Sequence, residues 1–182
     1  DPMEKAIYKY ANNLNIKNIL QNKGTKIKKY PFTDEHKMMA SAWQINNKIL
    51  ITAKGSPESI IKISTLSKEE KESINKELTN MQNIGLRVIA VSSKEYPKNS
   101  NIPNDISKLK LNFIGLIGFI DPPKDNIRSY ISTCKKAGIK VVMITGDNGI
   151  TASAIASEVG IPSSKVITGE MLEKMSLEEL QE

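Results

Sequence analysis

The chain has 182 residues, of which 39% are hydrophobic, so it is long enough for one large or two small domains with buried cores. Its net charge of +6 suits an anionic partner, but aromatic and basic residues are not interleaved, which argues against nucleic acid as that partner. The single cysteine, Cys134, excludes an internal disulfide, and the longest apolar stretch, 113–120, is far shorter than a bilayer-spanning helix.

The first part of the chain predicts a mixture of helices and antiparallel strands. In chain order, the predicted elements are a helix over 2–14, strands over 27–31, 38–44 and 48–53, a helix that starts at Ser56 and Pro57, a helix over 67–84, and strands over 86–92 and 111–119. Asn46-Asn47 indicates a hairpin turn, and Ser67 with Glu70 forms a capping box. The polar segment 94–107 is predicted to be a surface loop.

Beyond residue 120 the predicted elements alternate. They are a helix over 123–137, a strand over 139–144, a helix over 149–159 and a short strand over 165–167. This alternation is typical of a parallel, doubly wound α/β sheet. A last capping box, Ser176 with Glu179, predicts the start of another helix. We therefore expect two architectures, an α+β domain with an antiparallel sheet over 1–119 and a partial α/β domain over 120–182.

Three short motifs carry the functional signal. Thr145, Gly146 and Asp147 follow a predicted strand and bring a hydroxyl, backbone N–H groups and a carboxylate to the carboxyl edge of a sheet, where phosphate and Mg²⁺ chemistry occurs. Alone, this triplet also fits an ordinary turn. Asp121-Pro122-Pro123-Lys124 stands one helix and strand before it, and Lys54-Gly55-Ser56-Pro57-Glu58 stands further upstream.

In this order the three motifs resemble those of P-type cation-transporting ATPases of the calcium-pump type (type II). The resemblance implies a nucleotide-binding domain over 1–119 and part of a haloacid-dehalogenase-like, Rossmann-like phosphorylation domain over 120–182. It implies ATP and Mg²⁺ as cofactors, and ATP or ADP and the remainder of the pump as partners: the actuator domain, the rest of the phosphorylation domain and the transmembrane helices. We expect a soluble fragment of a protein at the cytoplasmic face of a cell membrane.

The segment 30–39 is similar to the family's Phe-Ser-x-x-Arg-Lys-x-Met sequence. The resemblance implies that Phe32 stacks on adenine and that Lys37 lines the pocket. His36 stands where the family has arginine, so an imidazole takes the place of a guanidinium group. A phenylalanine at a strand end is otherwise most often a core residue.

Four further residues are assigned to the nucleotide by the same resemblance. Lys54 and Gly55 match the family's Lys-Gly-Ala-Pro-Glu motif, Glu4 matches an acid near the adenine edge, and Arg87 matches an arginine that reaches the phosphates. Each has a plainer alternative. Lys54 and Arg87 could be solvent-exposed strand residues, and Glu4 could only stabilise the helix dipole.

The motifs of the second part are assigned to phosphoryl transfer. The resemblance implies that Thr145, Gly146 and Asp147 contact the terminal phosphate and its Mg²⁺, and that Asp121 approaches the phosphorylation site. No residue of the chain is assigned as a metal ligand. The family's phosphorylated aspartate lies in an Asp-Lys-Thr-Gly-Thr string that does not occur here, so we expect the chain to bind nucleotide without hydrolysing it.

Two other functions stay open at this point. One is a free-standing haloacid-dehalogenase-like phosphohydrolase, and the other is a non-catalytic nucleotide-binding module. Long apolar segments on both sides of the chain in its open reading frame would favour the pump. Calcium is the ion that the family suggests, with manganese or a monovalent cation as alternatives, because ion ligands lie in membrane helices.

Overall fold

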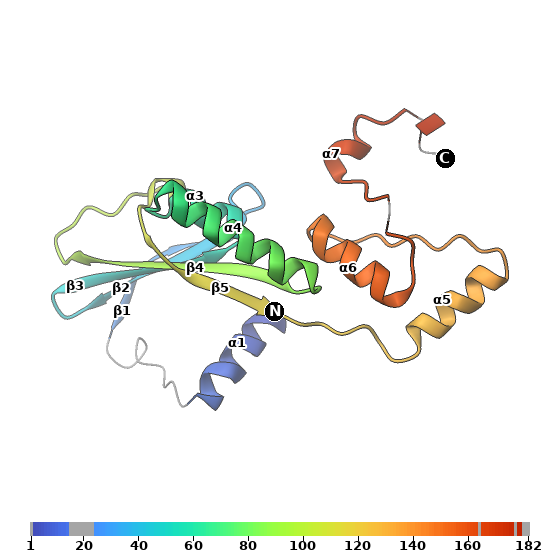
Figure 1. Cartoon of the computed structure of the whole chain (residues 1–182). Helices are drawn as coiled ribbons and strands as arrows, with labels where there is room; N and C mark the ends of the chain where they lie inside the picture. Colours follow the sequence, from blue (N-terminus) through green and yellow to red (C-terminus); the bar gives the residue numbers. More distant parts are fainter. Residues whose placement is uncertain (1, 15–23, 164, 177, 180–182) are drawn as a thin grey trace. The chain divides into compact units, whose positions relative to one another are not determined.

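A computed structural model describes residues 2–14, 24–163, 165–176 and 178–179. The chain divides into two compact units. Unit 1 comprises Asp1–Leu78 and Val88–Phe119, and unit 2 comprises Thr79–Arg87 and Ile120–Glu182. The elements are coloured along the sequence in Figure 1, from blue at the N-terminus to red at the C-terminus.

Unit 1 is built around one five-stranded sheet. Its strands, in spatial as well as chain order, are β1 (Thr25–Tyr30), β2 (Met38–Ile45), β3 (Lys48–Gly55), β4 (Arg87–Pro97) and β5 (Asn112–Phe119). The pairs β1–β2, β2–β3 and β3–β4 are antiparallel. Asn46 adopts φ +52° in the turn between the paired residues Ile45 and Lys48, a conformation that asparagine tolerates well. The predicted antiparallel sheet and its hairpin are confirmed.

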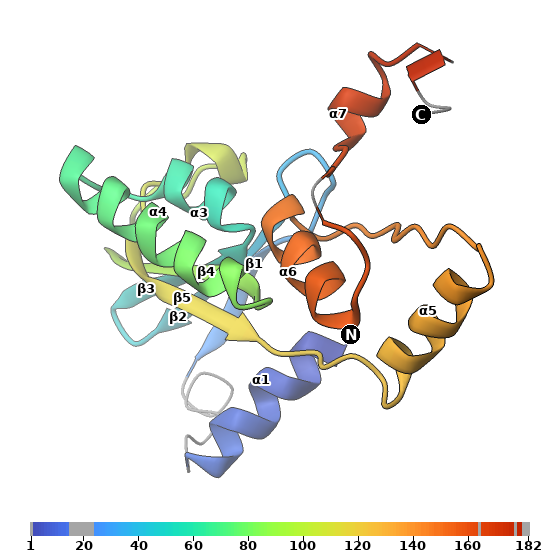
Figure 2. The same cartoon turned by 45° about the vertical axis from the view of Figure 1, so that its right-hand side comes forward.

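The core of unit 1 lies between one face of the sheet and helix α3 (Pro57–Ile63). Ile49, Ile51 and Ala53 are buried on β3, at the alternate positions that a strand directs to one face. Ile60 and Ile63 of α3 belong to the same cluster. Figures 1 and 2 show α3 and α4 (Lys68–Asn83) over this side of the sheet. Burial of these aliphatic side chains is the main driving force for folding of the unit.

The opposite side of the sheet carries the only tryptophan of the chain. Trp43 follows the buried Ala42 on β2 and is half-buried, and Lys26 of β1 lies opposite it in the antiparallel register. The Lys26 ammonium group lies 4.7 Å from the centroid of the indole ring, a cation–π arrangement.

The helix starts of unit 1 match their sequence signals. Helix α1 (Pro2–Asn13) begins with the predicted proline. The Ser56 hydroxyl caps α3 by accepting the Ser59 N–H at 3.3 Å. In the capping box of α4, the Ser67 N–H donates to Glu70 Oε2 at 2.7 Å and the Glu70 N–H donates to Ser67 Oγ at 3.2 Å.

The predicted surface loop over 94–107 is partly wrong. Strand β4 continues to Pro97, because the whole length of β3 pairs with it, from Lys48 opposite Pro97 to Gly55 opposite Ala90. A neighbouring strand that supplies backbone partners outweighs the polar composition of this stretch. The following segment contains a short 3-10 helix, η1 (Ile106–Lys108).

The segment before η1 is fastened to β1. The Lys28 ammonium group donates to Pro103 O at 3.0 Å and to Asn104 Oδ1 at 2.6 Å, and the Tyr30 hydroxyl donates to Pro103 O at 2.6 Å. Tyr30 is 5% exposed, and this burial raises the pKa of its phenol.

Unit 2 contains helices α5 (Ile127–Lys136), α6 (Gly149–Val159) and α7 (Gly169–Leu172). The predicted helix over 149–159 is confirmed, with Asn148 Oδ1 accepting the Ile150 N–H at 2.9 Å and Gly160 in the left-handed conformation at its end. The helix predicted over 123–137 begins only at Ile127. Asn126 adopts φ +66°, outside the right-handed helical region, so the helix starts after it.

The two strands predicted for unit 2 are wrong. Residues 139–144 and 165–167 are described without strand structure, and Ile139, Val142 and Ile144 are 56%, 68% and 94% exposed. A strand needs a neighbouring strand to pair its backbone groups, and none of the described residues from 120 to 179 lies in a strand. The described residues of 120–179 therefore do not show the expected doubly wound sheet. The capping box at Ser176 is present, with the Ser176 N–H donating to Glu179 Oε2 at 2.8 Å.

No helix in the described part of the chain is both long enough and apolar enough to cross a membrane.

Candidate functional site

Three of the residues predicted to bind nucleotide lie at one end of the sheet, where β2 begins and β3 ends. Strand β2 begins where β3 ends, so Met38 pairs with Gly55 and Met39 pairs with Lys54. Lys37 directly precedes this pair, and the Ser56 N–H donates to Lys37 O at 2.9 Å. Lys37, Lys54 and Gly55 are thus brought together by the register of one hairpin.

The connection from β1 to β2 forms a single tight turn over residues 33–37. The Thr33 carbonyl accepts the Lys37 N–H at 2.8 Å, and the Thr33 hydroxyl accepts the His36 N–H at 3.2 Å. Lys37 ends this turn at φ +49°, in the left-handed region that residues with a side chain rarely adopt. Phe32 stands just before the turn and is 55% exposed, so its ring is outside the buried core and accessible to a ligand.

Gly55 allows the backbones of two strands to approach closely. A Cβ atom built on Gly55 would lie 2.5 Å from both Lys37 O and Met38 Cα, and it would also overlap Met38 Cβ. These are backbone and first side-chain atoms, which cannot rotate away. Glycine is therefore required here by packing, whatever its role toward a ligand.

Lys54 and Glu4 form an ion pair although they are far apart in the sequence. The Lys54 ammonium group donates to Glu4 Oε1, and the two side chains are 28% and 53% exposed. Glu4 lies in the first turn of α1, so its carboxylate stabilises the helix dipole as well as pairing with Lys54. The structure thus brings a sequence-predicted acid next to a sequence-predicted lysine.

A second group of predicted residues meets in unit 2. The Arg87 guanidinium forms an ion pair with Asp147 through Nη2, and its Nε–H donates to Asp147 Oδ1 at 2.7 Å. The Asp147 N–H donates to Thr145 Oγ1 at 3.1 Å. Open space surrounds the Cβ position of Gly146, and Asp121 is exposed in the segment between β5 and α5. Arg87 is therefore paired with the Thr145-Gly146-Asp147 motif.

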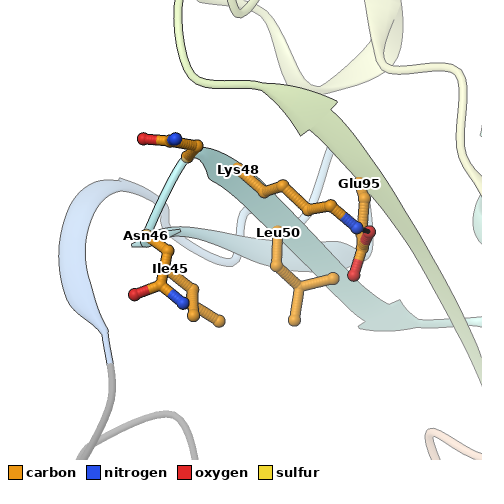
Figure 3. Close-up of a pocket in the computed structure, with 6 residues that line it drawn as sticks. Ile45, Asn46, Lys48, Leu50 and Glu95 are labelled. Carbon is orange, nitrogen blue, oxygen red and sulfur yellow. Dashed lines mark hydrogen bonds and ion pairs between the residues drawn. The ribbon is translucent and has the colours of Figure 1, made fainter.

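A pocket lies at the other end of the sheet, next to the β2–β3 turn (Figure 3). Ile45 and Leu50 contribute apolar surface, and Lys48 forms an ion pair with Glu95 at 2.5 Å. Lys48 and Lys54 stand at opposite ends of β3, roughly 20 Å apart at about 3.3 Å per residue. The pocket is thus separate from the predicted nucleotide residues.

The described residues contain no group of three or more His, Cys, Asp and Glu side chains placed to hold a metal ion. Asp147, the carboxylate of the Thr145-Gly146-Asp147 motif, is engaged by Arg87.

The sequence reasoning did not single out Thr33 or the Ser56 backbone amide. A threonine three residues before His36 is the pattern of a capped turn, and this signal was available. The left-handed conformation of Lys37 had no such signal, because lysine has no preference for it.

Comparison with known proteins identifies the family. The sequence model for "P-type ATPase, cytoplasmic domain N" matches residues 1–126, which is more than half of the chain. The chain belongs to this family.

Several named pumps are similar to the chain. It is 34% identical over 193 residues to calcium-transporting ATPase 1 of Bacillus cereus, a match that covers 99% of the chain and 22% of that protein. It is 33% identical over 202 residues to the sodium/potassium exporting P-type ATPase cta3 of Schizosaccharomyces pombe, covering 99% of the chain and 20% of that protein. It is 35% identical over 187 residues to the sodium/potassium-transporting ATPase subunit alpha-A of Artemia franciscana, covering 90% and 18%. The chain therefore spans about a fifth of the length of these relatives.

Proposed function

We propose that the chain binds an adenine nucleotide at the end of the sheet formed by the 33–37 turn and the last residues of β3. The observation that carries the proposal is the meeting of Lys37, Lys54 and Gly55 at this end, with the exposed ring of Phe32 just before the turn. An exposed aromatic ring provides a face for adenine, and ammonium groups suit the phosphates.

The Glu4–Lys54 ion pair fits this proposal and adds a condition to it. Glu4 offers a carboxylate that could accept a hydrogen bond from the exocyclic amine of adenine. Lys54 has its charge compensated by Glu4, so a phosphate must compete with that carboxylate for the ammonium group. We therefore expect weak binding, with a dissociation constant of about 0.1 to 1 mM.

For the parent protein we propose a cation pump that uses ATP through an aspartyl phosphate at the cytoplasmic face of a membrane. Residues 1–119 would be its nucleotide-binding domain and 120–182 part of its haloacid-dehalogenase-like phosphorylation domain. Thr145, Gly146, Asp147 and Asp121 would act in phosphoryl transfer, and Arg87 would reach the phosphates. Mg²⁺ would supply charge neutralisation. Its partners would be ATP or ADP and the remaining domains of the pump.

Calcium is the proposed ion, because relatives named calcium-transporting ATPases occur in several bacteria and in yeast. Relatives named for sodium and potassium have a similar sequence identity to the chain, so a monovalent cation is the second candidate. The match of residues 1–126 to the P-type ATPase domain favours a pump over a free-standing phosphohydrolase.

The test is an NMR titration of the chain with ATP, ADP and inorganic tripolyphosphate. ATP and ADP should shift the signals of Phe32, Lys54 and Gly55. Phe32→Ala should weaken the binding of both nucleotides by about 1–3 kcal/mol, as loss of base–aromatic stacking does elsewhere. Tyr130→Ala is the matched control, because this ring is comparably exposed (62%) and has no assigned role.

Equal responses to tripolyphosphate and ATP would exclude Phe32 as an adenine platform. Absence of any response to ATP up to several times the expected dissociation constant would refute nucleotide binding by the chain.

A further inference from the structure

The 33–37 turn is fastened at both ends to rigid parts of unit 1. Before it, Tyr30 is buried and its hydroxyl donates to Pro103 O at 2.6 Å. After it, Lys37 O accepts the Ser56 N–H at 2.9 Å. Ser56 in turn caps α3, whose Ile60 is fully buried. The ends of the connection are therefore held by the core.

Between these fixed ends, the path of the backbone depends on the turn itself. The Thr33 hydroxyl accepts the His36 N–H at 3.2 Å, and the Thr33 carbonyl accepts the Lys37 N–H at 2.8 Å. A threonine hydroxyl in this position stabilises the first turn of a helix by satisfying a backbone donor that has no partner within the turn. Here the Thr33 hydroxyl satisfies the His36 N–H in an isolated turn that no helix continues.

The conformation of Lys37 makes the turn sensitive to this bond. At φ +49° its backbone is in an unfavourable region for a residue with a Cβ, so the surrounding hydrogen bonds must hold it there. If the turn opened, Lys37 would relax to negative φ, and the orientation of its side chain relative to the Phe32 ring would change.

We propose that Thr33 is a positioning residue, whose hydroxyl holds Phe32 and Lys37 in the relative orientation that grips one nucleotide. This inference rests on the proposed function. Thr33 acts through the turn and needs no contact with the ligand. The effect is preorganisation: a turn that is already formed does not have to be ordered when the ligand binds.

The test compares Thr33→Val and Thr33→Ser in the whole chain. Valine keeps the branched shape and removes the hydroxyl, whereas serine keeps the hydroxyl. Thr33 is exposed, so neither change disturbs the core. Thr25→Val is the matched control, because Thr25 is also exposed and begins β1.

We expect Thr33→Val to bind ATP and ADP about fivefold more weakly, with Thr33→Ser and Thr25→Val within about twofold of the unchanged chain. In Thr33→Val the amide signals of His36 and Lys37 should move, while the amide signals of β3 stay the same and the folded variant still binds more weakly. A purely structural role for Thr33 would instead lower the unfolding midpoint and leave nucleotide binding by the folded variant unchanged.

The outcomes separate the two proposals. If the unchanged chain does not bind ATP, the proposed function fails and this inference fails with it. If the unchanged chain binds and Thr33→Val binds equally well, only the inference is overturned. Weakening by Thr33→Ser to the same extent as by Thr33→Val, or a loss of the sheet signals in Thr33→Val, would also overturn it.

Discussion

Replacing Gly55 by alanine should destabilise unit 1 through the contact between β2 and β3. The added Cβ would lie 2.5 Å from Lys37 O and Met38 Cα, where ordinary contacts begin at 3.4 Å. The strands must therefore separate by about 0.9 Å at this pair, the difference between these two distances. The Ser56 N–H to Lys37 O bond, now 2.9 Å, would be stretched beyond hydrogen-bonding range.

The magnitude follows from three contributions. Overpacking of a tight contact costs about 1–3 kcal/mol, and the lost backbone hydrogen bond about 1 kcal/mol more. Alanine restricts the unfolded chain more than glycine does, which offsets about 0.4–1 kcal/mol. We expect the free energy of unfolding to fall by about 1–3 kcal/mol.

Urea denaturation followed by circular dichroism measures this change. Gly115→Ala is the matched control, because Gly115 also lies in a strand, no atom approaches its Cβ position within 4 Å, and it has no positive φ. This control should be unchanged or slightly more stable. If Gly55→Ala is as stable as Gly115→Ala, the close approach of the two strands does not exist as described.

Four further predictions address other parts of the chain. Amide hydrogen exchange should be faster over 140–144, which form no strand, than over 48–53 in the centre of the sheet. Burial raises the pKa of the Tyr30 phenol above 10.0, so the contribution of the neutral phenol to stability is complete below pH 10 and is lost as the pH rises through the raised pKa. The unfolding midpoint should therefore fall at alkaline pH, and it should fall less in Tyr30→Phe. Ser92 is fully buried and its hydroxyl has no partner among the described residues, so Ser92→Ala should leave the unfolding free energy unchanged or raise it by up to about 1 kcal/mol; a clear loss would reveal a bound water. Incubation with γ-labelled ATP should leave no acid-stable label on the chain, and retained label would show that another nucleophile is present.

The sequence predicted unit 1 well because its local signals agree with its tertiary structure. The Asn46-Asn47 turn and the alternating pattern of β3 both indicate the antiparallel sheet, and the capping box at Ser67 marks the start of α4. Strand β4 was underestimated, since its second half is polar and is held by pairing with β3 rather than by its own composition.

Unit 2 was predicted less well for a physical reason. Helix α6 has its caps and its own hydrogen bonds, so its bounds could be predicted from the sequence alone. The apolar stretch 139–144 has the composition of a strand, but a strand depends on a neighbour that composition does not specify. Sequence patterns thus predict self-contained elements more reliably than elements completed by another segment.

For the candidate site, the motif resemblance predicted the candidate residues but not their pairing. Neither the ion pair of Glu4 with Lys54 nor that of Arg87 with Asp147 could be expected from sequence spacing, because 50 and 60 positions separate the partners. The roles of these residues toward nucleotide stay predictions until binding is measured.

The single tryptophan gives the chain an intrinsic fluorescent probe that reports on unit 1 alone. Trp43 lies on β2, within unit 1, and unit 2 has no indole in any of its residues. Fluorescence emission excited selectively at the indole will therefore follow the melting of unit 1 alone. Circular dichroism, in contrast, sums the helices of both units. Any gap between the two denaturation curves would measure how independently the halves of the chain unfold.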